Sequence, residues 1–447
     1  MMMIQWDSAK PLLDRWVVEG QNLEEVDIHT NLARQWKNGG NMFDRDAPWA
    51  EYQKSFAPYY NREFFGRLVQ EGQSNLWIDL WCQQAGAEST GNLGFVDFQP
   101  RSYLITPVSD LGDPVCPIID AHNHLDSLKP DMLLSIMDRS GVEVIMSLSD
   151  QRTGDDYFPE VDRLKAVLGD RLICGAPVQW WRLGETGFAD RVIDNLRRGV
   201  EKGATNALKI YKNLGVVYKD ELDDGKLVRL DDERIAPIFE ACGRELNIPV
   251  VVHVADPEAF FHPLNGENER LKELAAHPDW YFFSEDLPDR RQLLGIMEQV
   301  LVNHPATLFQ CVHVGNDPEN LGNVATMLNR HPNMVVDIAA RVAELGRQPH
   351  RARKFFMAYA DRIMFGSDLP PHEEMYALYR RFLETDDDYF PYPTHVSGQG
   401  EWRISGINLP EEALRKVYHD NAARIYLKQD IPGIIEANKA AGATDFE

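Results

Sequence analysis

The sequence lacks the features that mark a membrane, secreted or disulfide-stabilised protein. No apolar run approaches the length needed to span a bilayer. The opening residues, MMMIQWDSAKPLLDRW, contain neither the basic region nor the apolar core of a signal peptide. The five cysteines are scattered and form no CxxC pair, which argues against a disulfide scaffold. We therefore expect a cytoplasmic protein.

Positive charge is scarce as well. The chain has 46 lysines and arginines against 70 aspartates and glutamates, which gives a formal net charge of -24 over 447 residues. This excess of negative charge argues against nucleic acid and against a membrane surface as partners. The length would fit roughly two or three ordinary domains, although α/β barrels run long as single domains.

From residue 117 onward, short apolar runs alternate with longer amphipathic segments. Buried parallel strands read as continuous apolar runs, and helices that alternate with them form βαβ units. Eight consecutive units predict a closed (β/α)8 TIM barrel of the α/β class. A doubly wound open sheet is the alternative, but it rarely needs this many units, and no GxGxxG follows the first run. The apolar runs are 117–125, 142–150, 171–181, 206–215, 248–256, 307–315, 333–341 and 362–370.

The first 115 residues do not share this alternation and are rich in aromatic residues and asparagine. We expect an N-terminal extension, 1–115, whose α+β structure the sequence does not define, then the barrel over 116–430 and a C-terminal tail over 431–447. The phrase WIDLWCQQAGAEST loosely resembles a methyltransferase cofactor site, but it lacks the glycines that let a backbone approach a cofactor. A segment this short buries little surface on its own. We therefore expect it to have a structural or oligomerisation role, in which it packs against the barrel or against a second subunit of a homo-oligomer.

Side chains of the metal-binding type end four of the predicted strands. In a barrel, catalytic groups gather where strands end and βα loops begin, and side chains two apart on a strand point the same way. Imidazole and carboxylate are ligands of divalent transition metals. Taken singly, a strand-end histidine is more often structural, and an aspartate after Gly-Ser is often a helix N-cap. Their joint placement favours a metal site formed by His122 and His124 (first run), His253 (fifth), His313 (sixth) and Asp368 (eighth).

This order of motifs resembles the signature of the amidohydrolase superfamily. The phrases IIDAHNHLD, IPVVVHVAD, CVHVGNDPENL and DRIMFGSDLPP are similar to those of its amidohydrolase-related (amidohydrolase 2) branch. The resemblance covers roughly residues 117–430, including the closing segment LRKVYHDNAARIYL, and leaves the N-terminal extension unexplained. The branch also contains lactonases, hydratases and nonoxidative decarboxylases, so the motifs are specific for fold and metal chemistry and unspecific for substrate.

The resemblance implies a role for each strand-end residue. His122, His124, His253 and Asp368 would hold one divalent metal ion, zinc or alternatively manganese, with a position open for water. Asp368 would take a proton from this water, and His313 would polarise the substrate carbonyl or donate a proton. The implied activity is metal-dependent hydrolysis of a C–O or C–N bond (lactone, ester or amide) in a small polar substrate. A decarboxylase or hydratase of the same branch is the alternative, and a non-catalytic ligand-binding barrel is the second.

Lys209, on the fourth predicted strand, leaves the number of metal ions open. In two-metal members of the superfamily a lysine on this strand is carboxylated and bridges the ions, and Lys212 is the nearby alternative. We favour a plain lysine that orients a substrate oxygen or pairs with Asp368, because the branch that the sequence resembles is mostly mononuclear and lysine readily serves as a plain charge.

Further candidates for substrate binding lie on other predicted strands or in the loops after them. Aromatic rings at a barrel mouth can stack on a substrate, and an arginine can bind a carboxylate, although loop packing and surface ion pairs are common alternatives. Residues 384–406 interrupt the helical pattern and are long enough for a lid. The substrate-binding candidates are Trp180, Trp181, Tyr211, Phe260, Arg341 and Arg347.

Overall fold

The structure is a computed structural model that describes residues 102–125, 129–148, 157–220, 225–392, 400 and 402–430. The N-terminal extension up to residue 101 and the tail 431–447 lie outside these ranges, so their expected roles stay predictions. The described residues belong to two compact units. One holds 106–258, 288–393 and the residues from 402 onward, and the other holds 102–105, 259–287 and 400.

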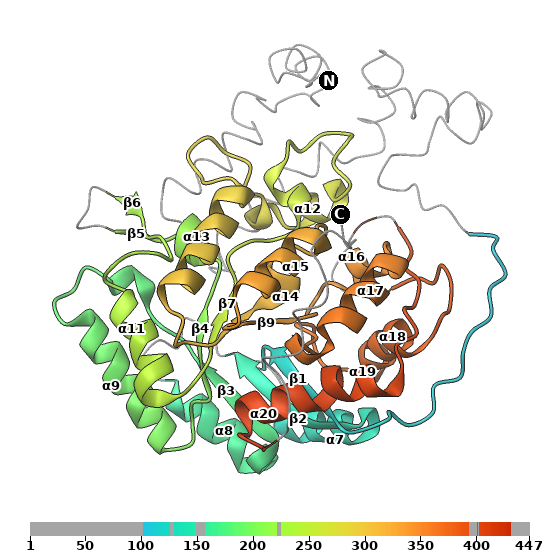
Figure 1. The fold of residues 1–447 in the computed structure, drawn as a ribbon, viewed down its shortest axis with the longest axis horizontal. Helices are drawn as coiled ribbons and strands as arrows, with labels where there is room; N and C mark the ends of the chain where they lie inside the picture. Colours follow the sequence, from blue (N-terminus) through green and yellow to red (C-terminus); the bar gives the residue numbers. More distant parts are fainter. Residues whose placement is uncertain are drawn as a thin grey trace, which may run out of the picture. The chain divides into compact units, whose positions relative to one another are not determined.

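The first unit contains a sheet of eight parallel strands in sequence order (Figure 1). Hydrogen bonds also join the first strand to the residues that follow the last strand: Ala121 N–H donates to Phe365 O at 3.0 Å, and Asp368 N–H donates to His122 O at 2.8 Å. The sheet therefore closes almost completely, which confirms the (β/α)8 barrel. The strands are β1 (Ile118–Asn123), β2 (Val142–Leu148), β3 (Leu172–Ala176), β4 (Ala207–Ile210), β7 (Val250–Val252), β8 (Phe309–Cys311), β9 (Met334–Asp337) and β10 (Ile363–Met364).

Helices connect successive strands and surround them (Figure 1). Within the described ranges, no helix is both long and apolar enough to cross a membrane. The main ones are α7 (Pro130–Ser140), α8 (Phe158–Leu168), α9 (Phe188–Glu201), α11 (Ala236–Ala241), α13 (Arg290–Asn303), α15 (Leu321–Arg330), α17 (Pro349–Tyr359), α18 (Glu373–Glu384), α19 (Glu411–Arg415) and α20 (Asn421–Tyr426).

Local sequence explains where these helices begin and which face they bury. Helix α13 starts with a capping box, in which Asp289 accepts from the backbone of Gln292 and the Gln292 side chain accepts from the Asp289 backbone. Its buried apolar residues, Leu293, Met297 and Val300, follow the three-to-four spacing of one helix face. Every strand residue in the sheet except Glu143 is buried, as expected for parallel strands covered by helices.

The second unit includes a segment that follows β7 in the sequence. It contains all of the 3-10 turn η7 (Glu258–Phe261) except its first residue, together with α12 (Leu271–Ala276) and the 3-10 turn η8 (Pro278–Trp280). Its aromatic side chains pack on one another: the rings of Phe260 and Trp280 are stacked with centroids 6.2 Å apart. The backbone N–H of Phe282 donates to Phe260 O at 2.9 Å.

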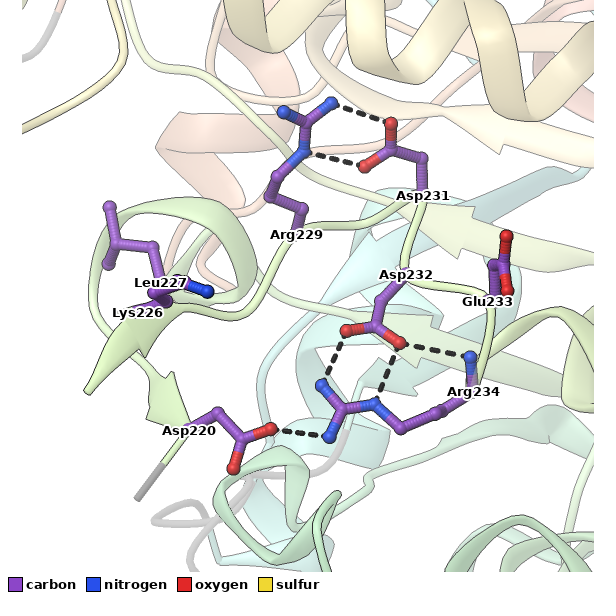
Figure 2. Close-up of a pocket in the computed structure, with 8 residues that line it drawn as sticks. All are labelled: Asp220, Lys226, Leu227, Arg229, Asp231, Asp232, Glu233 and Arg234. Carbon is purple, nitrogen blue, oxygen red and sulfur yellow. Dashed lines mark hydrogen bonds and ion pairs between the residues drawn. The ribbon is translucent and has the colours of Figure 1, made fainter. Parts of the chain in front are cut away.

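A hollow of about 670 Å³ lies beside the short hairpin β5 (Lys219–Asp220) and β6 (Lys226–Leu227), as Figure 2 shows. Five of the seven charged side chains in its lining pair with one another. Arg229 contacts Asp231 at 2.7 Å, and Arg234 contacts both Asp232 and Asp220. Because these charges are already compensated within the lining, the hollow gives no reason to expect a ligand.

Candidate metal centre

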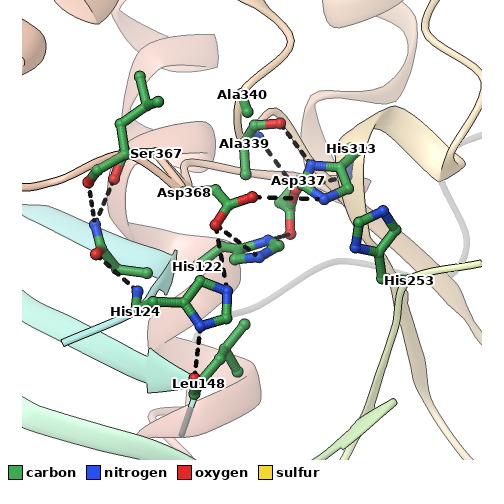
Figure 3. Close-up of polar contacts among 12 residues, drawn as sticks. His122, His124, Leu148, His253, His313, Asp337, Ala339, Ala340, Ser367 and Asp368 are labelled. Carbon is green, nitrogen blue, oxygen red and sulfur yellow. Dashed lines mark hydrogen bonds and ion pairs between the residues drawn. The ribbon is translucent and has the colours of Figure 1, made fainter. Parts of the chain in front are cut away.

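The strand ends bring the predicted ligand side chains together (Figure 3). His122 lies within β1, whereas His253 and His313 follow the ends of β7 and β8. Asp368 follows β10 and approaches β1 through the preceding Gly366. A Cβ atom on Gly366 would lie only 2.9 Å from the Cβ of His122, so only glycine permits this approach.

Asp368 is the centre of the cluster. Its Oδ1 lies 3.3 Å from His124 Nε2 and 3.7 Å from His122 Nε2, and its Oδ2 lies 3.7 Å from His313 Nε2. One ligand atom from each of His122, His313 and Asp368 falls within 4.8 Å of the other two, a spacing that a metal ion could bridge. His124 and His253, which the sequence analysis placed among the ligands, are outside this tightest group.

Hydrogen bonds fix the orientation of three imidazole rings. Nδ1 of His124 and Nδ1 of His313 donate to the carbonyl oxygens of Leu148 and Ala339, both at 2.7 Å. Nδ1 of His122 donates to the Asp337 carboxylate at 3.0 Å. In its neutral form each ring therefore keeps a lone pair on Nε2, the atom that faces Asp368.

The buried ring nitrogens suit a metal ion. Nε2 of His122 and Nε2 of His313 are buried, and neither finds a hydrogen-bond partner in the described part of the chain. A buried polar atom without a partner is costly, and metal coordination removes that cost. With a carboxylate beside these nitrogens, the donor set fits a divalent ion of the zinc type.

Burial and charge set the protonation states of the site. Burial lowers the pKa of His253 to about 4 and that of His313 well below its usual value. Burial alone would raise the pKa of Asp368, but the charges of His122, His124 and Lys209 outweigh it and hold that pKa below its ordinary value. At neutral pH Asp368 is thus a carboxylate, and His253 and His313 are neutral, which are the states in which these groups bind metal.

His253 lies next to an ion-paired carboxylate. Its Nε2 is 3.4 Å from Asp256 Oδ1, and its ring centroid is 4.4 Å from that of His313. Asp256 also contacts the ammonium of Lys212. Burial would raise the pKa of Asp256, but Lys212 first and then His253 and Arg341 hold it well below its usual range. Lys212 is therefore ion-paired with Asp256, whereas Lys209 does not contact that carboxylate.

Lys209 is buried in the barrel on β4, and the described residues offer its Nζ no hydrogen-bond partner. Burial lowers the pKa of Lys209 to about 8, although the charges of Asp368 and Asp337 favour its protonated form. Its Nζ lies 5.2 Å from the centre of the Tyr211 ring, and that ring is 5.9 Å from the ring of His124. The hydroxyl of Tyr211 donates to Leu148 O at 3.1 Å.

The remaining substrate-binding candidates have other surroundings. Trp180 is fully buried and packs near Phe188, with ring centroids 6.1 Å apart. Trp181 is 45% exposed, beside Tyr218. Phe260 belongs to the second compact unit and packs on Trp280 there.

The two arginines after β9 differ from each other. Arg341 is buried, donates to Ala340 O at 2.8 Å and lies 3.7 Å from Asp256 Oδ1, beside the metal-binding cluster. Arg347 is exposed, and its guanidinium lies 4.0 Å from the ring centre of Trp402. Residues 393–399 and 401 of the segment expected to form a lid, 384–406, lie outside the described residues.

The sequence analysis did not identify the buried carboxylates at the site that are not themselves candidate ligands. Asp337 ends β9 and contacts His122, and Asp256 contacts His253. Asp120 is buried within β1 and accepts hydrogen bonds from Ser367 and Tyr376. One signal was available for Asp337, since a charged residue directly follows the apolar strand residues MVV, but a single strand-end aspartate is common.

The backbone is strained at three of the strand ends. His313 and Val314 have φ values of 56° and 59°, Ala340 has 50° and Asp368 has 50°. Residues other than glycine rarely adopt this left-handed conformation, and for a β-branched valine it is a clear exception. Such strain persists where surrounding contacts impose it, and it is often found at functional sites.

Comparisons with known proteins identify the family. No curated protein matches the chain. Solved structures that match include an uncharacterised TIM-barrel protein from Bordetella bronchiseptica, at 15% identity and a TM-score of 0.42, covering 70% of this chain and 99% of that one. A zinc-bound amidohydrolase from Burkholderia multivorans matches at 16% identity and a TM-score of 0.42, covering 70% and 99%. Dihydroorotase from Campylobacter jejuni matches at 14% identity and a TM-score of 0.42, covering 71% and 85%.

The sequence profile of the family described as amidohydrolase matches residues 119–428, which is more than half of the chain and nearly the whole predicted barrel. This match confirms the resemblance drawn from the motifs at the strand ends. The chain belongs to the amidohydrolase family and is an enzyme of amidohydrolase type.

Proposed function

We propose that this enzyme hydrolyses a C–O or C–N bond, in a lactone, ester or amide of a small polar compound, with a divalent metal held at the strand ends. The strongest support is the pair of buried Nε2 atoms of His122 and His313, which lack hydrogen-bond partners in the described residues and face Asp368. His122, His124, His253 and Asp368 would hold the ion, zinc or alternatively manganese.

A divalent ion bound there supplies a coordinated water whose pKa falls toward about 7. Asp368 is a carboxylate at neutral pH because its neighbours hold its pKa below the ordinary value. It can therefore accept a proton from the attacking water and pass it to the leaving group. Its negative charge also suits it as a ligand.

His313 needs a more specific assignment. Its Nδ1–H is committed to Ala339 O, and burial keeps the ring neutral, so Nε2 offers a lone pair. This state favours His313 as a proton acceptor or as an additional ligand. The role implied by the resemblance, polarising the substrate carbonyl or donating a proton, would require an imidazolium.

Lys209 is the candidate for substrate recognition. Its ammonium is buried close to Tyr211, and no carboxylate in the described residues lies within ion-pair distance of it. We propose that Lys209 binds a substrate oxygen, such as a carbonyl or carboxylate oxygen. A carboxylated Lys209 that bridges two metal ions is the alternative, and metal stoichiometry separates the two.

Metal analysis of the purified enzyme tests the central proposal. We expect about one equivalent of zinc or manganese in the wild type. Replacing both His122 and His124 by alanine should remove it, whereas His350→Ala, at an exposed position on α17, should not. A well-folded wild type without metal would contradict the hydrolytic mechanism and leave a metal-free lactonase as the fallback.

Single substitutions separate the roles of the two later histidines. If His253 is a ligand and His313 is not, His253→Asn should lose metal while His313→Asn keeps it and loses most of kcat. Equal metal loss in both variants would assign His313 to the ligand set, in agreement with its position in the tightest group.

The bond that is cleaved requires a substrate panel. Lactones, amides and aromatic acids would be incubated with enzyme and followed for acid release and for CO2 release. Acid release supports hydrolysis, and CO2 release supports the decarboxylase alternative. Tight binding without turnover would support a non-catalytic barrel. We further propose a cytoplasmic enzyme with no nucleic-acid or membrane partner, from its charge and cysteine pattern.

A further inference from the structure

Asp337 accepts hydrogen bonds on both carboxylate oxygens, and it is completely buried at the end of β9. Oδ2 accepts from His122 Nδ1 at 3.0 Å and from Gln310 Nε2 at 2.6 Å. Oδ1 accepts from the backbone N–H of His313 at 2.8 Å and from that of Ala339 at 3.1 Å. The carboxylate therefore contacts two of the three residues in the tightest metal-binding group (Figure 3).

The orientation of Gln310 shows which atom carries the proton between Asp337 and His122. The Gln310 amide donates through Nε2 to Ala121 O at 3.2 Å, and its Oε1 accepts from the Tyr426 hydroxyl. Because both ends of the amide are engaged, Nε2 must face Asp337. Since Gln310 Nε2 donates to Oδ2 and the backbone N–H groups of His313 and Ala339 donate to Oδ1, Asp337 acts as an acceptor on both oxygens, and the hydrogen of neutral His122 lies on Nδ1.

The second contact of Asp337 acts on the backbone of His313. His313 and Val314 adopt φ values of 56° and 59°, which cost free energy in residues other than glycine. The bond from His313 N–H to Asp337 is a charge-assisted one within this turn. It holds the turn that presents the His313 ring to Asp368, 3.7 Å away.

We propose that Asp337 is a positioning residue that sets the tautomer of His122 and the backbone turn of His313 at the same time. A single carboxylate on β9 thereby prepares ring nitrogens from β1 and from the loop after β8 for one metal ion. The tautomer depends on the hydrogen-bond geometry alone, whereas its consequence for metal affinity rests on the proposed function.

The decisive measurement uses the metal-free wild type and needs no substitution. Nitrogen-15 NMR of the histidine side chains reports which ring nitrogen carries hydrogen. We expect His122 to carry it on Nδ1 and to have a bare Nε2. An Nε2–H tautomer of His122 in the folded wild type would overturn the proposal. This result does not depend on activity, so an enzyme with the expected tautomer that binds no metal contradicts only the proposed function.

Asp337→Asn tests the consequence for the metal. An asparagine cannot accept at both ends, so its NH2 group must face either His122 and Gln310 or the two backbone N–H groups. The first orientation moves the His122 hydrogen onto Nε2, and the second releases the His313 turn. Either change should lower metal affinity about 10- to 100-fold, measured by competition with a chelator.

Asp387→Asn is the matched control. Asp387 is also buried and accepts several hydrogen bonds, from Ser109 and Arg381, but none from a histidine ring of the described residues. It should keep wild-type metal affinity. Wild-type affinity in folded Asp337→Asn, or an equal loss in both variants, would overturn the proposal, and if Asp337→Asn does not fold, the wild-type tautomer decides.

Discussion

Among single residues, Lys209 is one whose buried charge should lower the stability of the folded protein. Its side chain is fully buried, and burial lowers its pKa from 10.5 to about 8. Below pH 8 the folded and unfolded chains both carry the charge, so the folded state bears the whole cost of burying it. As the pH rises from 8 to 10.5, the folded lysine loses its proton first and the cost disappears.

Lys209→Met should therefore stabilise the metal-free protein while it impairs catalysis. The pKa shift corresponds to up to about 3 kcal/mol at pH 7, since one pKa unit equals about 1.36 kcal/mol. The gain should shrink between pH 8 and pH 10.5. Urea unfolding at several pH values measures it. A gain that does not change with pH would show that the charge of Lys209 is not its source.

Lys212→Met is the contrasting control for this experiment. Lys212 contacts buried Asp256, so its removal leaves a carboxylate with less compensation and should destabilise the protein. The Lys209→Met variant also tests carboxylation of Lys209, by metal analysis. If Lys209 bridges two ions, Lys209→Met should lower the metal content of the holoenzyme from two equivalents.

At the scale of elements, Arg290 joins the loops that carry His253 and His313. It is the first residue of α13 and is buried. Its guanidinium donates to the backbone oxygens of Asp256 and Asn316, at 3.0 and 2.9 Å. It also contacts carboxylates in both loops, namely Glu258 at 2.6 Å, Asp317 at 2.9 Å and Glu319 at 2.8 Å.

Arg290→Met should destabilise the barrel by about 3–5 kcal/mol, because buried Asp317 and the carbonyl groups lose their donor. Arg291→Met, at the exposed neighbouring position, is the control and should change stability by less than about 0.5 kcal/mol. Urea unfolding of both variants measures the difference. If the two variants unfold at the same urea concentration, Arg290 does not hold the loops.

The eight barrel strands were predictable because each is a short apolar run before an amphipathic helix. Their ends were less predictable. The third run was expected to extend to residue 181, whereas β3 ends at Ala176, since the following loop residues Val178 and Trp180 are also buried. Burial produces apolar sequence in strands and loops alike, so hydrophobicity does not mark where pairing stops.

The positions of the site residues followed from the strand order, but their fine geometry did not. A closed barrel brings strand ends together, so His122, His313 and Asp368 could be grouped without coordinates. The left-handed turn at His313 and Val314 contradicts the local preference of valine and arises from tertiary contacts. The hydrogen bond from the backbone N–H of His313 to Asp337 depends on that turn, so the sequence did not predict it either.

At the scale of the whole barrel, the seam between β1 and β10 is where a metal ion would matter most. Strand β10 has only two residues, Ile363 and Met364, and its ladder contact is to β9. The seam to β1 depends on a few hydrogen bonds, including those from Ala121 N–H to Phe365 O and from Asp368 N–H to His122 O. An ion held by His122 and Asp368 would cross this seam directly.

We therefore expect metal to stabilise the barrel and to protect this seam in particular. Free metal at 100 times its dissociation constant adds about 2.7 kcal/mol to the free energy of unfolding. Hydrogen exchange measured with and without a chelator should show the largest metal-dependent protection at the amides of Ala121, Ser367 and Asp368. The His122→Ala, His124→Ala double variant should show no response to metal. Uniform protection across all strands would mean that the ion stabilises the fold without acting at the closure of the barrel.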